Sequence, residues 1–142
     1  VALGKPVHLA IISSGAAFDQ SLDYVTTSSP RNMEEPFARS KNLGEQEVEH
    51  LLGQQTMVNA SILYPPVVLD ATQSKGIIPY SAQKALRGEV IENNASPDAG
   101  MNMMLAEDLG KAVIAVTERQ QLSFARYPMK GYRIPTKELL QK

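Results

Sequence analysis

Two short apolar runs predict buried strands. Residues 7–12 form a nearly continuous apolar run that ends in a Ser-Ser-Gly turn, and residues 58–64 form a second run that is closed by two prolines. A run without polar alternation is typical of a parallel strand that is covered on both faces. Proline cannot continue a hydrogen-bonded ladder, so the second strand is expected to end at its carboxyl side.

The segment between these runs predicts a crossover helix. Residues 19–36 are polar and rich in Ser, Thr, Pro and Asn, which indicates a long loop, and Pro36 stands where a helix can begin. From residue 37 to residue 52, positions 37, 41, 44, 48, 51 and 52 recur at three- and four-residue spacings and predict one common face. Gly53 is expected to end the helix. Strand, helix and strand in this order predict a right-handed parallel β-α-β unit.

Helical and strand-like segments also alternate in the rest of the chain. The pattern predicts helices over residues 77–87 and 107–119, strands over residues 101–105 and 122–127, and a final helix opened by Pro135.

Composition and charge narrow the class of protein. The 142 residues are 43% hydrophobic and 20% charged with a net charge of −1, which suits one soluble domain and does not favour nucleic acid as a partner. The absence of cysteine excludes disulfides and thiolate metal sites and fits a reducing compartment, so the cytoplasm is the expected location. No apolar run approaches the roughly 20 residues that span a bilayer, so we expect no membrane partner. Neither His8 nor His50 has a partner at metal-binding spacing, and no metal site is expected.

Four local patterns follow one another in a fixed order: ISSGAAF (12–18), EPFARSK (35–41), ILYPPVV (62–68) and MNMMLAEDLGKAV (101–113). Together they resemble the extended short-chain dehydrogenase/reductase family, which includes NAD-dependent nucleotide-sugar epimerases and dehydratases. The resemblance covers nearly the whole chain and corresponds to the carboxyl-terminal half of such proteins. It implies an α/β fold, with a partial doubly wound, Rossmann-like parallel sheet in residues 1–66. Residues 67–142 would form a small carboxyl-terminal substrate-binding lobe with a helix that returns to the sheet.

The resemblance also implies which residues form the site. Ser14 matches the family's catalytic serine, which orients the substrate oxygen. Lys41 matches the lysine of the Tyr-x-x-x-Lys motif, and Phe37 occupies the tyrosine position. Tyr64 stands where the family usually has arginine and is expected at the substrate with Ser14, while Pro65 and Lys41 are expected at the cofactor.

The spacing of the Tyr-x-x-x-Lys motif has a chemical reason. Side chains four residues apart on a helix lie on one face and reach the same cofactor. The lysine ammonium stabilises tyrosinate, because a tyrosine pKa near 10 is otherwise too high for acid/base work near neutrality. The tyrosine moves a proton while hydride passes to or from the nicotinamide. Phe37 has no ionisable hydroxyl, and Tyr24 in the preceding loop is the candidate replacement.

A second element of the family is absent from this sequence. No Gly-x-Gly-x-x-Gly or related turn occurs, although such a turn lets the backbone approach a dinucleotide pyrophosphate. The intact protein is therefore expected to use NAD or NADP, whereas this chain alone is not expected to bind it tightly. In the family, strand 7–13 also pairs with strands that this sequence lacks, and an unpaired apolar strand edge promotes association. We expect a missing amino-terminal half, or a homo-oligomer partner, to cover this edge.

Several of these residues also have a plainer interpretation. Ser14 fits a turn residue and Lys41 a solvated helix lysine as well as they fit catalytic equivalents. The remaining candidates are expected to be structural: Phe37 in the core, the acidic run Glu45, Glu47 and Glu49 on a solvated helix face, Met101, Met103 and Met104 in packing, and Asp108 at a helix start.

Three functions are compatible with this sequence. The chain is a fragment or degenerate member of an NAD(P)-dependent sugar-nucleotide epimerase, dehydratase or reductase, which acts on a small molecule such as a nucleotide sugar. Alternatively, it is a non-catalytic binding or regulatory module that kept the fold and lost the tyrosine. The third possibility is a small structural α/β domain with an accidental resemblance.

Overall fold

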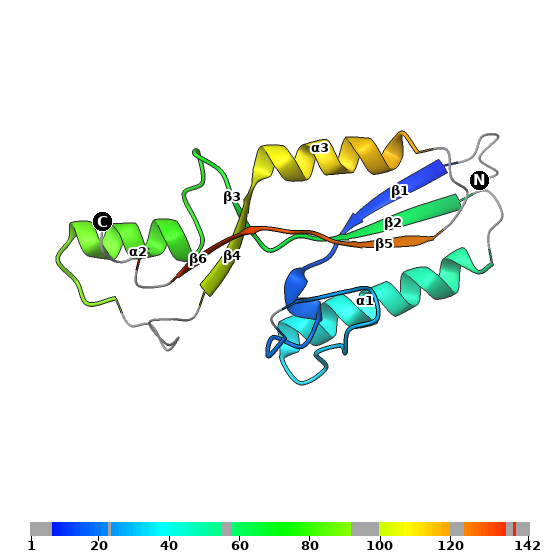
Figure 1. The fold of residues 1–142 in the computed structure, drawn as a ribbon, viewed down its shortest axis with the longest axis horizontal. Coiled ribbons are helices and arrows are strands. Elements are labelled where there is room, and N and C mark those ends of the chain that lie inside the picture. Colours follow the sequence, from blue (N-terminus) through cyan, green and yellow to red (C-terminus); the bar gives the residue numbers. More distant parts are fainter. Residues whose placement is uncertain are drawn as a thin grey trace.

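A computed structural model describes residues 7–22, 24–54, 58–91, 100–119, 124–135 and 138 (Figure 1). The elements in chain order are β1 (Val7–Ile12), the short 3-10 helix η1 (Gly15–Ala17), α1 (Pro36–Leu52), β2 (Val58–Tyr64), β3 (Val67–Leu69), α2 (Ile77–Leu86), β4 (Gly100–Leu105), α3 (Ala106–Thr117), β5 (Ala125–Pro128) and β6 (Tyr132–Pro135). Among the described residues, no helix has both the length and the apolar character that crossing a bilayer requires.

The first sheet is parallel and has the strand order β1-β2-β5. Strands β1 and β2 pair in register from Val7↔Val58 to Ile12↔Leu63, with α1 as the connection between them. In Figure 1, α1 lies against one face of this sheet and α3 against the other. The predicted parallel β-α-β unit and the predicted Rossmann-like α/β class are therefore confirmed.

The second sheet has the strand order β3-β4-β6. Strands β3 and β4 are parallel, whereas β4 and β6 are antiparallel. Helix α3 follows β4 directly and contacts strands of both sheets, so it ties the second sheet to the first. The expected strand over residues 122–127 is β5, which returns to the first sheet beside β2.

Pro135 is the last residue of β6 and lies opposite Gly100, where an edge strand can hold a proline whose missing amide hydrogen is not needed. The helix expected after Pro135 falls almost wholly outside the described residues. Asp108 lies in the first turn of α3, as expected for a residue at a helix start, and pairs there with Lys111.

The face of α1 that packs on the sheet also differs from the predicted face. The buried positions are Ala38, Asn42 and Glu45, whereas Phe37 is 51% exposed. One residue turns an α-helix by about 100°, so the true face lies roughly a quarter-turn from the predicted one. The helical spacing is confirmed, but the predicted buried face is wrong by one residue. Two of the three buried positions are polar, so the apolar pattern does not reveal them.

The best-packed region lies where η1, β2 and α1 meet, at the carboxyl end of the first sheet. Ala17, Phe18, Ile62 and Tyr64 form its fully buried cluster. The rings of Phe18 and Tyr64 meet edge to face with their centroids 4.8 Å apart. The turn after β1 is therefore anchored in the core.

Strand β1 is an edge of the first sheet in the described part of the chain. It pairs with β2 on one side, and no described strand lies on its other side. Leu9 is 42% exposed and Ile12 is 48% exposed. An apolar strand in this position presents both unpaired backbone groups and apolar side chains.

Candidate functional site

Ser14 lies in the turn that follows β1. Its backbone is extended, and its hydroxyl oxygen caps η1 by accepting a hydrogen bond from the Ala16 amide at 3.2 Å. The next amide, that of Gly15, donates to the carbonyl of Pro65 at 2.8 Å. A Cβ on Gly15 would lie 3.3 Å from that carbonyl oxygen, so glycine permits the close approach. This contact brings the predicted Ser14 and Pro65 together at the carboxyl edge of the sheet.

Lys41 and Phe37 share one face of the first turns of α1. The helix is capped by Glu35, whose carboxylate accepts from the Ala38 amide at 2.6 Å, and Pro36 occupies its first position. The Lys41 ammonium lies 5.5 Å from the centroid of the Phe37 ring, an arrangement that favours the cation electrostatically. The two side chains therefore share one face of the helix, and their roles at a cofactor stay a prediction. The expectation that Phe37 is a core residue is wrong, because its ring is half exposed beside the lysine.

Tyr64, which was expected at the substrate, has its side chain inside the molecule. It is 1% exposed, and its hydroxyl donates to Glu45 Oε2 at 2.6 Å and accepts from Arg31 Nη2 at 3.1 Å. Burial, and then the hydrogen bond to Glu45, raise the pKa of Tyr64 above its ordinary value. The proposed contact between Tyr64 and a substrate stays a prediction.

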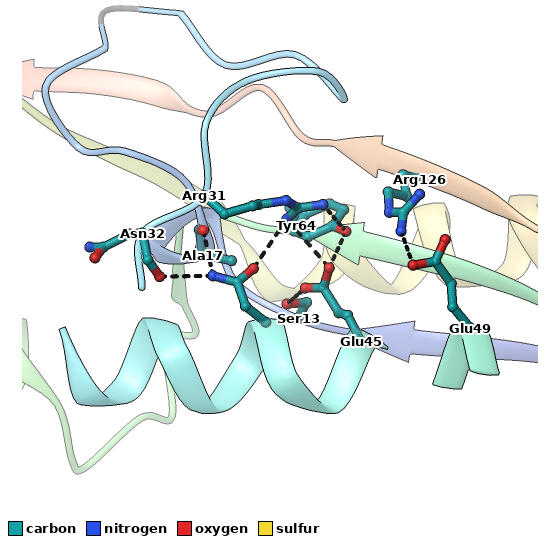
Figure 2. Close-up of polar contacts among 9 residues, drawn as sticks. Ser13, Ala17, Arg31, Asn32, Glu45, Glu49, Tyr64 and Arg126 are labelled. Carbon is teal, nitrogen blue, oxygen red and sulfur yellow. Dashed lines mark hydrogen bonds and ion pairs between the residues drawn. The ribbon is translucent and has the colours of Figure 1, made fainter. Parts of the chain in front are cut away.

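Glu45 is the buried centre of this polar cluster (Figure 2). It is 5% exposed, so the expectation of a solvated acidic face is wrong for this residue. Its Oε1 accepts from the Ser13 hydroxyl at 2.5 Å, and its Oε2 accepts from Tyr64 and lies 3.3 Å from Arg31 Nη1. A buried carboxylate needs such partners because desolvating an unpaired charge is costly.

Arg31 holds the end of the long loop against this cluster. Its guanidinium carbon lies 4.2 Å from the Phe18 ring centroid and 5.0 Å from that of Tyr64. The backbone of Arg31 bridges to Phe18, and the side-chain amide of Asn42 donates to the carbonyls of Ala17 and Asn32 at 2.9 and 2.8 Å. The loop between β1 and α1 is thus closed at its base by buried polar contacts.

A small cavity opens beside the cluster, between α1 and β5. Its volume is about 220 Å³, and it is lined by Arg31, Met33, Asn42, Glu45, Gln46, Glu49 and Arg126. Arg126 Nη2 pairs with Glu49 Oε2 at 2.6 Å, while the Nε of Arg126 is buried without a hydrogen-bond partner. Two acidic and two basic side chains balance each other here, so the lining favours neither an anion nor a cation.

The described residues contain no group of three or more His, Asp or Glu side chains that could hold a metal ion. His8 instead makes a hydrogen bond with the Ser61 hydroxyl at 2.9 Å, and His50 makes one with Gln54 at 3.0 Å.

Reasoning from the sequence missed the polar cluster of Ser13, Arg31, Asn42 and Glu45. One signal was available in principle, since Asn42 and Glu45 stand four and seven residues after Ala38 and so continue a helical stripe. Nothing local identified Arg31, because its partners come from α1 and from the end of β2.

Comparison with protein-family models and with curated protein sequences gives no match. Solved structures do match. The chain is similar to UDP-N-acetylglucosamine 4-epimerase from Methanobrevibacter ruminantium, solved with UDP-N-acetylmuramic acid, with a TM-score of 0.74 and 16% identity over 93% of this chain and 44% of that one. It is also similar to UDP-glucose 4-epimerase from Thermus thermophilus, solved with NAD, with a TM-score of 0.72 and 16% identity over 94% of this chain and 46% of that one.

A dehydratase gives the same result. The dTDP-glucose 4,6-dehydratase from Bacillus anthracis, solved with NAD, has a TM-score of 0.72 and 14% identity over 92% of this chain and 43% of that one. The chain therefore spans less than half the length of the structures it matches. These neighbours are sugar-nucleotide epimerases and dehydratases of the extended short-chain dehydrogenase/reductase family, and the chain has the fold of one part of such an enzyme.

Proposed function

We propose that this chain is the carboxyl-terminal half of an NAD(P)-dependent sugar-nucleotide epimerase, dehydratase or reductase in which phenylalanine has replaced the catalytic tyrosine. The observation that carries the proposal is the pairing of two features in one fold. Ser14 lies in the turn after β1, fixed to the end of β2, and Lys41 lies over Phe37 at the start of α1, the helix that connects these strands.

The residues present fit the cofactor only in part. Lys41 and Pro65 lie at positions that would face a dinucleotide at the carboxyl edge of the sheet, where open α/β sheets bind their ligands. The sequence has no glycine-rich turn to receive the pyrophosphate. We therefore infer that NAD or NADP needs the missing amino-terminal half, and that this chain alone does not bind it tightly.

The residues of this chain can position a substrate, but residue 37 cannot transfer a proton to or from it. The Ser14 hydroxyl can orient a substrate oxygen, and the Lys41 ammonium can favour negative charge near it. The Phe37 ring gives or takes no proton, and general acid/base catalysis is worth roughly 10²–10⁴-fold. Tyr24 is exposed in the preceding loop and remains the candidate for supplying a hydroxyl.

The missing half would also complete the sheet. Strand β1 has a free edge in the described part of the chain, and an added parallel strand would pair with its backbone. The substrate class proposed for the completed protein is a nucleotide sugar, in line with the ligands of the similar structures. A homo-oligomer partner at this edge is the alternative.

The proposal is tested by restoring the hydroxyl. In the longest natural form of the protein, Phe37→Tyr is expected to raise turnover of a UDP-sugar with NAD by about 10²-fold or more over the parent, since it returns the proton carrier. Phe37→Leu is the matched control without a hydroxyl, and Lys41→Met in the Phe37→Tyr background is expected to remove the gain. Calorimetric titration of NAD into the 142-residue chain should give no binding in the micromolar range.

A second candidate function is favoured by Phe37 itself. The half-exposed ring beside Lys41 keeps the shape of the tyrosine site and lacks its chemistry, which suits a binding or regulatory module. In that case the longest form binds dinucleotide or nucleotide sugar, and Phe37→Tyr gives no turnover. Absence of both binding and turnover in the longest form would refute both functions.

A further inference from the structure

The carboxylate of Glu45 connects the segments that meet at the candidate site. It receives a hydrogen bond from Ser13, the residue before Ser14, and it lies one helical turn after Lys41 on α1. Figure 2 shows its side chain directed from α1 toward Ser13 and the Tyr64 hydroxyl. One buried group therefore touches the turn after β1, the end of β2 and, through Arg31, the end of the intervening loop.

We propose that Glu45 is a positioning residue, which holds the Ser13–Ser14 turn in a fixed place relative to the Lys41 turn of α1. The assignment of a shared substrate to Ser14 and Lys41 rests on the proposed function. The inference that Glu45 holds the Ser13–Ser14 turn in place does not depend on that function, because it follows from the contacts of Glu45 alone.

The contacts at this position use both oxygens of the carboxyl group. Two hydroxyls donate to it, one to each oxygen, and a guanidinium lies beside the second oxygen. Glutamine replaces one of these two oxygens by an amide nitrogen that donates, so at that position it cannot accept the bond from Ser13 or from Tyr64. Hydrogen bonds to a charged acceptor are shorter and stronger than neutral ones, and the 2.5 and 2.6 Å distances fit that class.

Ser14 is fixed on both sides by this arrangement. On one side, the Ser13 amide donates to Leu63 at 2.8 Å while its hydroxyl is held by Glu45. On the other side, the Gly15 amide donates to Pro65 at 2.8 Å. The backbone bonds hold the turn to β2. The Glu45–Ser13 bond ties the start of the turn to α1, and the Asn42–Ala17 bond ties η1 to the same helix.

The test that does not depend on activity is amide hydrogen exchange in the 142-residue chain. Glu45→Gln is expected to speed exchange of the Ser13 and Gly15 amides about tenfold relative to amides of α3, because local opening becomes easier when a charged acceptor is lost. The matched control is Glu49→Gln, which removes a carboxylate one turn further along α1 that pairs with Arg126 instead of the turn. It should leave the ratio unchanged.

Variants at Ser13 isolate the same bond from the opposite side. Ser13→Ala leaves Glu45 paired with Tyr64 and Arg31, so folding is retained if Glu45→Gln proves too unstable to measure. Ser13→Ala should speed exchange at Gly15 by a similar factor, Ser13→Thr should restore the parent value, and the double variant with Glu45→Gln should add little. Exchange that rises evenly over the whole molecule, or equally in Glu49→Gln, would overturn the proposal and leave Glu45 with a merely structural role.

A second readout applies once turnover has been restored by Phe37→Tyr in the longest form. There Glu45→Gln is expected to lower kcat about tenfold or more and to leave KM for the dinucleotide unchanged. The substitution displaces Ser14 but does not change the residues that bind the dinucleotide. A rise in KM with unchanged kcat would contradict the positioning role. If no form of the protein turns over, the proposed function fails, and the exchange ratios alone still decide the inference about Glu45.

Discussion

At the scale of single residues, the hydrogen bond between Tyr64 and Glu45 is expected to contribute measurably to the stability of the fold. The Tyr64 hydroxyl is buried and donates to a buried carboxylate. Tyr64→Phe should lower the free energy of unfolding by about 1.5–3 kcal/mol in urea denaturation, the range for bonds to charged groups. Tyr127→Phe is the control, because the Tyr127 hydroxyl has only a 3.4 Å contact with the exposed Arg119, and it should stay within about 0.5 kcal/mol. Equal losses in the two variants would contradict the assignment.

The same residue predicts an alkaline instability. Burial and the bond to Glu45 raise the pKa of Tyr64 in the folded state, whereas the unfolded chain has a pKa of about 10. The unfolded state therefore loses this proton first, so the contribution of Tyr64 is present below about pH 10 and is lost as the pH rises above it. Urea midpoints measured from pH 8 to pH 11 should fall less steeply in Tyr64→Phe than in the parent chain.

At the scale of elements, the sequence predicted those features that depend on local pattern. The apolar runs of β1 and β2 and the proline at the start of α1 are local signals, and each element was found within a residue or two. The two short strands β3 and β6 were not predicted, because three or four residues carry too little periodicity and pairing with β4 decides them.

The polar part of the site could not be predicted in the same way. Ser14 and Lys41 were found through motif resemblance, whereas Glu45 has partners 32 and 19 residues away in the sequence. A glutamate among other acidic residues on a helix predicts a solvent-exposed face when its distant partners are unknown. Glu45 is therefore buried by hydrogen bonds to distant residues, although its local sequence predicts exposure. For the same reason the buried face of α1 differs from the predicted one.

The observed orientation of α1 can be checked by one substitution on its buried face and one on an exposed side. Ala38 is fully buried, so Ala38→Leu should overpack the interior at this position and destabilise the chain by about 1–3 kcal/mol. Leu43 is about half exposed on another side of the helix, and Leu43→Ala should cost less than about 1 kcal/mol. Thermal or urea unfolding measures both. A larger loss in Leu43→Ala than in Ala38→Leu would mean that the observed face of α1 is wrong.

At the scale of the whole molecule, the free edge of β1 governs how the chain behaves alone. Leu9 and Ile12 are 42% and 48% exposed on a strand that no described strand pairs on its outer side. A strand edge of this kind recruits another strand, and a charged side chain on it opposes such pairing. Sedimentation velocity of the 142-residue chain should therefore show association that increases with concentration.

The same edge can be blocked by a charged side chain at a partly exposed position. Leu9→Lys should shift the chain toward monomer and leave the urea midpoint nearly unchanged, because the side chain is already partly in water. Leu86→Lys is the matched control: Leu86 is even more exposed but belongs to α2, away from the first sheet, and its charge should not change association. If the proposed amino-terminal half covers β1 in the longest natural form, Leu9→Lys should instead destabilise that form, because the lysine would then enter a buried interface. Association that is unaffected by Leu9→Lys but abolished by Leu86→Lys would move the contact from β1 to the second sheet and its helix.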